Sequence, residues 1–314
     1  MSVAKSGTRP SYACGDGLTT GVVTLFDRGP MGYEQILYEV DDPVATITLN
    51  RPEFLNAFTT QMGTELRHAV GEAERDPKVV GIVITGAGRG FCAGADMKML
   101  SGITDGSAAP SSEPAVESSV ESAGDPDAGD PTWGDDLRGT YTYLMSVPKP
   151  IIAAINGPIA GMAVPIALAC DLRFMANDAV LTIAFSQRGL VAEWGVGWLL
   201  PRLVGTGAAL DLLFSSRKVD GVECERLGVV NRAVDGDVVA VAREYINELA
   251  ARCSPTSLAI MKRQVYQGLH AGLGPKELEA QRLMAESFGR PDFNEGVQSF
   301  LQKRAPHFQR LPSA

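Results

Sequence analysis

Two short segments carry residues whose types and spacing could support chemistry. Residues 88–93 (GRGFCA) follow an apolar run and match the glycine-rich pattern G-x-G-x-x-A, which can hold the pyrophosphate of a dinucleotide. Glu193 lies among Val191, Trp194 and Trp198, and burial in such surroundings would raise the pKa of its carboxyl group towards that of a useful base. The alternative for Glu193 is a carboxylate held near a helix N-terminus by the helix dipole.

The dinucleotide interpretation lacks its confirming residue. A Rossmann site needs an acidic residue at a strand end about 20 positions further along, and that position here falls in a polar, acidic stretch. Other catalytic patterns are also missing: the chain has no G-x-S-x-G, and its histidines are isolated from one another. His68, His270 and His307 therefore do not indicate a nucleophile partner or a metal ligand, and we predict no metal site.

The charge of the chain is concentrated in one segment. The 314 residues carry a net charge of −9, and residues 101–136 contain nine acidic residues with no Lys or Arg. The remainder is electrically balanced, so neither nucleic acid nor an anionic membrane is an expected partner. No apolar run approaches the roughly 18 residues that a membrane helix needs.

The cysteines and the first residues of the chain favour a reducing cellular compartment. The five cysteines are odd in number, widely spaced and without a C-x-x-C pair, which is typical of neither a disulfide framework nor a zinc site. The opening residues lack the apolar stretch of a signal peptide. We therefore expect a cytoplasmic protein.

Alternating strand and helix patterns predict an α/β core that positions these segments. Residues 34–40 and 44–49 flank Asp41-Asp42-Pro43 and predict a β-hairpin, and apolar residues from Met62 to Ala73 recur at helical spacing. Continuous apolar runs predict buried strands at 79–85, 150–156 and 172–176. The later part of the chain predicts helices at 206–214, 221–227, 237–252, 255–269 and 274–288, with few strand signals except Val229-Val230.

These patterns divide the chain into three regions. Residues 1–30 are rich in Gly, Ser and Thr and predict a flexible arm; residues 31–205 form the core, and residues 206–314 a helical C-terminal region. Within the core, about 103–134 is predicted to be a disordered insertion in a surface loop, because its hydrophobicity is low and its charge one-sided. A solvated linker is the simplest role for it, and a lid or docking tail is the alternative.

Six segments, in order, resemble the crotonase (enoyl-CoA hydratase/isomerase) superfamily. The resemblance covers about 33–308 apart from the insertion. It implies an α/β spiral of β-β-α turns with a helical C-terminal trimerisation region, in trimers or dimers of trimers, that binds acyl-CoA thioesters. The segments are 50–57 (NRPEFLNA), 90–98 (GFCAGADMK), 149–157 (KPIIAAING), 167–173 (ALACDLR), 200–205 (LPRLVG) and 295–308, with E-G followed by F-L-Q-K-R-A-P-H-F.

The chemistry that the resemblance implies is stabilisation of a thioester enolate. Negative charge develops on the thioester oxygen, so fixed N–H donors must be aimed at it. By position, the resemblance assigns these donors to the backbone N–H groups of Ala93 and Met162. Met162 follows Gly161 at a predicted helix start, where the dipole favours an anion. The family often has Gly at this position, but a backbone donor survives the change.

The sequence departs from the family where hydratases commonly carry two glutamates. Pro165 and Phe185 occupy those positions, and neither side chain can transfer a proton. Glu193 stands where several family isomerases, and the aryl-CoA dehalogenases, carry a single Glu or Asp. One acid/base group can take a proton from one carbon and return it to another. The resemblance therefore favours double-bond isomerisation of an enoyl-CoA, with Pro165, Phe185, Trp194 and Trp198 shaping the acyl pocket.

The resemblance also implies a binding site for the CoA part of the substrate, with no other cofactor. Lys303 is a candidate phosphate contact, within the chain or across a subunit boundary. The other residues that match the family's CoA-binding segments are Arg51, Phe54, Leu55, Ala57, Ala95 and Asp96.

Two alternatives to an isomerase remain. One is a hydratase that uses Glu193 and an ordered water. The other is a catalytically weak acyl-CoA-binding paralogue in which the acidic insertion is an interaction segment. Substitution of Glu193 by Gln separates an enzyme from a binding protein, because only an enzyme loses turnover while still binding CoA esters.

Overall fold

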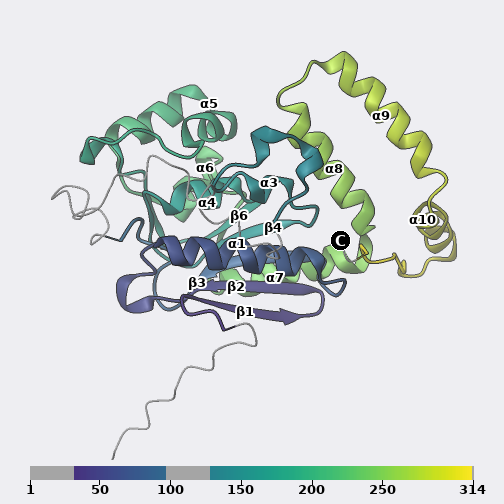
Figure 1. Cartoon of the computed structure of the whole chain (residues 1–314), viewed down its shortest axis with the longest axis horizontal. Coiled ribbons are helices and arrows are strands. Elements are labelled where there is room, and N and C mark those ends of the chain that lie inside the picture. The colour runs from purple at the N-terminus through teal and green to yellow at the C-terminus, as the bar shows by residue number, and fades with distance from the viewer. Residues whose placement is uncertain (1–31, 97–127, 313–314) are drawn as a thin grey trace, which may run out of the picture.

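A six-stranded sheet forms the centre of the molecule (Figure 1). The computed structural model describes residues 32–96 and 128–312. In the sheet, the strands follow the order β1-β2-β3-β4-β6-β9; β1 is antiparallel to β2, and the other neighbours are parallel. Their bounds are β1 (Ile36–Asp41), β2 (Val44–Leu49), β3 (Gly81–Gly86), β4 (Ile151–Ile155), β6 (Leu172–Ala176) and β9 (Arg232–Val234).

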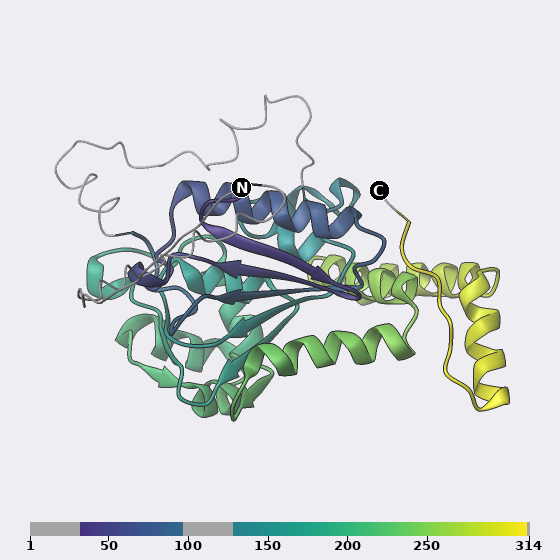
Figure 2. The same ribbon diagram turned by 90° about the horizontal axis from the view of Figure 1, so that it is seen from below.

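The two faces of this sheet bury two separate sets of apolar side chains. In β3, Ile82 and Ile84 join the core beneath α1 (Thr60–Arg75), whereas Val83 joins the core beneath α7 (Val238–Arg252). Figure 2 shows these helices on opposite sides of the sheet. Successive strand residues point to opposite faces, so a strand covered on both sides is apolar throughout. The predicted hairpin, helix and buried strands are confirmed.

A second, three-stranded sheet contains β5 (Ile159–Ala160), β7 (Val180–Thr182) and β8 (Val219–Asp220). The chain runs from β4 through β5 into α4 (Ala163–Ala169), and then from β6 through β7 towards α5 (Val196–Ser215). Each of these turns therefore adds one strand to each sheet and then a helix. This repeated order confirms the predicted β-β-α spiral.

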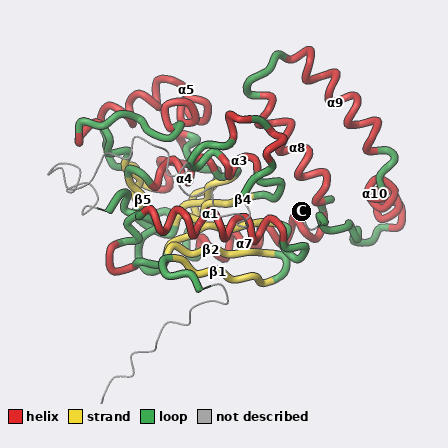
Figure 3. The backbone as a smooth tube through the Cα atoms, in the orientation of Figure 1, coloured by secondary structure: helices red, strands yellow, loops and turns green. Residues whose placement is uncertain are grey.

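The C-terminal part of the chain is mainly helical, as predicted (Figure 3). Besides β8, this part contains β9 at Arg232–Val234, which begins two residues after the predicted signal at Val229-Val230 and extends the main sheet. Figures 1 and 2 show α9 and α10 projecting away from the sheet. The helices here are α6 (Gly221–Leu227), α7, α8 (Pro255–Gly268), α9 (Leu273–Ser287) and α10 (Pro291–Gln302).

Helix α5 differs from two expectations. It crosses the predicted boundary between residues 205 and 206, and by length and composition it is apolar enough to span a membrane. Gly205, however, has non-helical backbone angles (φ 78°, ψ 160°) that divide the helix, and side chains such as Leu200 and Leu212 lie buried in the core. We therefore interpret α5 as a bent core helix.

The C-terminal end of the predicted acidic insertion, residues 128–134, differs from the prediction. Residues 97–127 lie outside the described part of the chain, as does the predicted flexible arm of residues 1–30. Residues 128–134, predicted to be disordered, instead pack on the core: Ala128 and Trp133 are buried. The N–H of Gly129 donates to the Glu74 carboxylate at 2.7 Å. Composition alone misplaced this end because one buried tryptophan anchors a polar segment.

Candidate active site

Two loops that follow β2 and β3 are joined edge to edge. Phe58 N–H donates to Gly94 O at 2.8 Å, and Asp96 N–H donates to Phe58 O at 3.1 Å. Ala93 N–H donates to Leu55 O at 2.9 Å. Residues 88–96 therefore run as an irregular loop with isolated bridges and do not open a helix at the glycines, which removes the context that a Rossmann site requires.

Asn56 organises this pair of loops, a role that the sequence did not predict. Its side chain is fully buried; its Oδ1 accepts from Arg51 N at 2.8 Å, and its Nδ2 donates to Ala87 O and Gly90 O. Leu55 and Asn56 both have positive φ (51° and 56°), a conformation that asparagine tolerates better than most residues. The sequence signal that could have identified Asn56 is its place within the N-R-P-E-F-L-N-A segment.

Six of the seven predicted CoA-binding residues lie on these joined loops. Arg51 pairs with Asp96 at 2.9 Å and donates to Ala57 O, and its guanidinium lies over the Phe54 ring, 4.8 Å from the centroid. Phe54 is half exposed and available to a ligand. Lys303 is separate: it is the C-terminal cap of α10, which extends away from the sheet (Figure 1).

Of the two backbone N–H groups predicted to bind the enolate oxygen, Ala93 N–H is unsuitable in the structure. Ala93 N–H is already bonded to Leu55 O, so it is not free to bind an oxyanion. Among the described residues, neither Ala95 N–H nor Met162 N–H has a protein acceptor. Gly94 brings these two segments together: its φ is +99°, and a Cβ there would lie 2.9 Å from Ala160 O and 3.7 Å from Met162 N. The structure thus offers Ala95 in place of Ala93, beside Met162.

Glu193 lies immediately before α5. Its carbonyl accepts from Val196 N–H at 3.0 Å, Trp194 has a left-handed backbone (φ 44°), and Gly195 is the N-cap of the helix. Such a conformation is costly for an aromatic residue and persists only when its surroundings impose it. Partial burial raises the pKa of the Glu193 carboxyl. The carboxyl is therefore placed near a helix N-terminus and is also desolvated, so the two interpretations of this residue are compatible.

The predicted acyl-pocket residues divide into two groups. Pro165 on α4 and Phe185 are buried, and Trp194 packs against the same core. Trp198 makes different contacts: it stacks on His270 at 5.1 Å, and the Arg202 guanidinium lies 3.6 Å from its ring centre. These contacts tie α5 to the segment after α8, so Trp198 packs helices together.

Tyr141 is a further aromatic residue at this place, and the sequence did not predict it. Its ring packs edge-on against Phe58 (5.8 Å) and Trp194 (5.7 Å). It therefore connects the loop pair described above to the segment that carries Glu193. A tyrosine in the short stretch between two apolar runs gives no sequence signal for such a position.

The described residues contain no group of three or more His, Cys, Asp and Glu side chains that could hold a metal ion. The four described cysteines, Cys92, Cys170, Cys224 and Cys253, are free thiols. Burial raises the pKa of Cys92, next to the joined loops, to about 12. This thiol therefore stays protonated and is a poor nucleophile.

The fold and the paired loops define a class of protein, and comparison with known proteins gives the same answer. The family "Enoyl-CoA hydratase/isomerase" matches residues 39–121 and 119–311. The chain belongs to this family, the crotonase superfamily, whose members act on acyl-CoA.

Individual relatives carry different reaction names. The chain is 33% identical over 281 residues to the 1,2-epoxyphenylacetyl-CoA isomerase of Escherichia coli K12, covering 88% of this chain and 98% of that protein. It is 35% identical over 287 residues to a Rhodobacter capsulatus protein named "Probable enoyl-CoA hydratase", covering 88% and 99%. The crystal structure of an enoyl-CoA hydratase from Polaromonas sp. JS666 superposes with a TM-score of 0.73 at 26% identity, covering 87% and 99%.

Proposed function

We propose that this protein is an enoyl-CoA isomerase that moves a carbon–carbon double bond with Glu193 as its single acid/base. The carboxylate removes a proton from one carbon of the bound thioester and returns it to another. An enolate forms between these two steps. A group that serves as base and then as acid needs a pKa above that of a free carboxyl, and burial shifts Glu193 in this direction.

In this proposal, the enolate oxygen lies between the N–H groups of Ala95 and Met162. Both groups lack protein acceptors among the described residues, and Gly94 allows the two segments to approach. Fixed donors aimed at a developing oxyanion contribute about 3–4 kcal/mol each to lowering a barrier. The CoA portion would lie along Arg51, Phe54, Leu55 and Ala57, whose loop is held to Asp96.

One observation carries the choice of isomerase. Pro165 and Phe185, at the positions where hydratases commonly have glutamates, are buried apolar residues. Among the described residues, Glu193 is the carboxyl group next to Trp194, whose ring contacts Tyr141. Addition of water commonly uses two carboxyl groups in this family, whereas transfer of one proton between two carbons needs only one. The names of the relatives do not favour either reaction, because the Escherichia coli relative is named an isomerase of an epoxyphenylacetyl-CoA and the Rhodobacter capsulatus relative a probable enoyl-CoA hydratase.

A paired assay tests the proposal. Purified protein is given a 3-enoyl-CoA in one arm and a 2-enoyl-CoA in the other, each repeated with Glu193→Gln. We expect conversion of the first substrate without hydration of the second, and a loss of at least about 100-fold in kcat in the variant. Hydration at a comparable rate that also depends on Glu193 would establish the hydratase alternative. CoA-ester binding without turnover in either arm would support the binding paralogue.

The assembly of the protein is part of the same proposal. Helices α9 and α10 project from the body and expose large apolar side chains, which in a monomer would face water. We propose that they pack against further copies of this chain in a cytoplasmic homotrimer or hexamer. Lys303 could then reach a CoA phosphate across the subunit boundary. The exposed side chains are Leu273, Leu278, Met284, Phe288, Phe300 and Leu301.

A further inference from the structure

Tyr141 occupies the boundary between the core and the proposed reaction site. Its side chain is only 4% exposed and lies between η3 (Asp135–Leu137) and α3 (Tyr143–Ser146). The ring makes edge-on contacts with Phe58 at 80° and Trp194 at 74°. These contacts on two sides fix the orientation of the ring, so the direction of its hydroxyl group is fixed as well.

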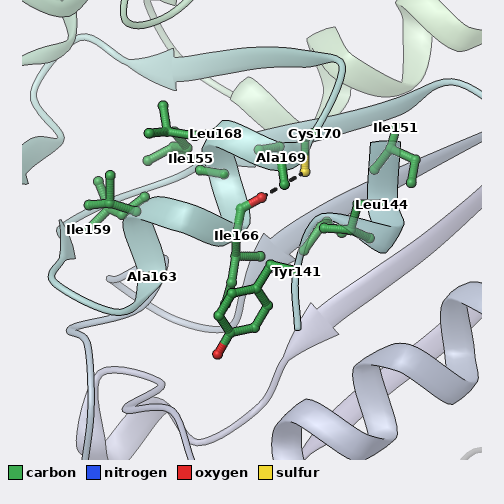
Figure 4. Close-up of a cluster of buried hydrophobic side chains, with 14 of the residues drawn as sticks. Tyr141, Leu144, Ile151, Ile155, Ile159, Ala163, Ile166, Leu168, Ala169 and Cys170 are labelled. Atoms are coloured by element: carbon green, nitrogen blue, oxygen red, sulfur yellow. Dashed lines mark hydrogen bonds between the residues drawn. The ribbon is translucent and has the colours of Figure 1, made fainter. Parts of the chain in front are cut away.

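The hydroxyl of Tyr141 has no hydrogen-bond partner within the described residues. Figure 4 shows it pointing away from the aliphatic cluster that includes Leu144 and Ile166. The oxygen is not among the fully buried polar atoms that lack a partner, although the residue as a whole is buried, so the hydroxyl reaches accessible space. It is therefore available to form a hydrogen bond with a ligand atom at the proposed site.

Tyr141 lies close to the segment that carries Glu193, because its ring contacts Trp194, the next residue along the chain. Burial raises the pKa of Tyr141, and the charges of Tyr143, Cys92 and Glu193 raise it further. A raised pKa keeps the phenol protonated, so it remains a hydrogen-bond donor. Glu193 and Tyr141 are not bonded to each other in the structure, and the carboxylate can only accept when ionised. A donor and an acceptor are thus presented together in an aromatic setting.

We propose that Tyr141 is a specificity-determining residue that binds a hydroxyl group on the acyl chain of the CoA thioester. A hydroxyl group both donates and accepts, so it can accept from Tyr141 while donating to Glu193. A hydrocarbon chain satisfies neither group, and a carbonyl oxygen would face the carboxylate without a proton to donate. The inference rests on the proposed acyl-CoA site and narrows its substrate class to hydroxylated acyl chains.

Equilibrium binding of saturated CoA esters, which carry no double bond to move, tests this assignment without relying on isomerase turnover. Butyryl-CoA is compared with 3-hydroxybutyryl-CoA and 4-hydroxybutyryl-CoA by calorimetry, using the wild-type protein and Tyr141→Phe. Tyr245→Phe is the matched control, because Tyr245 packs on Phe174 in the other core. We expect at least one hydroxyacyl ester to bind the wild type about tenfold more tightly than butyryl-CoA, the contribution of one hydrogen bond. Tyr141→Phe should lose this preference and keep its affinity for butyryl-CoA.

The other outcomes are distinct. Equal binding of all three esters by the wild type, or a preference retained in Tyr141→Phe, would overturn the role of Tyr141 and leave the proposed isomerase untouched. Loss of preference in Tyr245→Phe as well would show that the effect is not local and would also overturn it. Failure of every ester to bind the wild type would refute the acyl-CoA site itself, and both proposals with it.

Discussion

Arg51 and Asp96 lie 45 residues apart in the sequence, and their side chains form a 2.9 Å ion pair across the two loops of the site. Both side chains are largely withdrawn from solvent, at 16% and 17% exposure. Arg51 also donates to Ala57 O. The pair therefore holds the loop after β2 against the loop that carries Ala95.

Loss of either partner should loosen this arrangement. Arg51→Ala and Asp96→Asn should each lower the free energy of unfolding by about 2 kcal/mol, because each removes an ion pair whose two side chains are largely withdrawn from solvent. The double variant should cost less than the sum of the two, as measured by a denaturant double-mutant cycle. Arg75→Ala, which breaks a more exposed ion pair to Glu72 within α1, is the control and should cost about 0.5 kcal/mol or less. Additive effects of Arg51 and Asp96 would contradict a coupled pair.

The backbone donor at Met162 can be removed by a side-chain change. Its φ of −58° suits proline, and its N–H has no acceptor among the described residues, so Met162→Pro deletes the donor without breaking a backbone hydrogen bond. We expect kcat to fall about 100- to 1,000-fold in the isomerase assay. Met162→Ala keeps the N–H and should retain most activity. Equal losses in the two variants would instead assign the effect to the methionine side chain.

The pH dependence of activity should report Glu193. Burial raises the pKa of its carboxyl above the ordinary 4.5, and a base must be ionised, so kcat/KM should fall on the acid side at a higher pH than for a free carboxyl. The folded state binds this proton more tightly than the unfolded state, so stability decreases as pH rises between the two pKa values. Glu193→Gln should therefore be at least as stable as the wild type at pH 7 by denaturant unfolding. A clear loss of stability would indicate a structural role.

A buried lysine should make stability depend on alkaline pH. Lys149 is 2% exposed and donates to Ala73 O and Asp76 O near the end of α1, and burial lowers its pKa from 10.5 to about 8. Between these values the unfolded chain holds the proton more tightly, so stability from this group rises with pH. The difference in unfolding free energy between wild type and Lys149→Met should shift by about 2 kcal/mol in favour of the wild type from pH 7.5 to 9.5. A constant difference across this range would show that the pKa is ordinary.

The exposed face of the C-terminal helices should control assembly. Leu273 and Phe300 are each 83% exposed in the single chain. Leu273→Glu combined with Phe300→Glu should convert the protein to monomers in sedimentation experiments, because charges would face a closed apolar interface. Arg252→Glu is the control, because it adds negative charge on α7, which lies outside α8–α10. That helix already carries Glu244 and Glu248, so it should tolerate the added charge without loss of assembly. A wild-type protein that sediments as a monomer would refute the proposed assembly.

The sequence by itself was sufficient to predict the main helices and strands and to identify the family. The apolar runs that became β3, β4 and β6 are buried on both faces, and burial of that kind leaves a continuous pattern that periodicity can detect. The six ordered motifs located the loops of the site, because the glycines and polar residues in them meet local backbone requirements. The missing glutamates at Pro165 and Phe185 were equally visible, since they are a matter of residue type alone.

Only the tertiary structure decided which groups meet. The bond from Ala93 N–H to Leu55 O joins residues far apart in the chain and moved the proposed donor to Ala95. Tyr141 contacts Phe58 and Trp194 beside the segment that carries Glu193, and Trp198 stacks on His270. Trp133 anchors the end of a segment whose composition predicted disorder. Each of these results depends on long-range packing, which a local pattern does not encode because the partners come from separate elements.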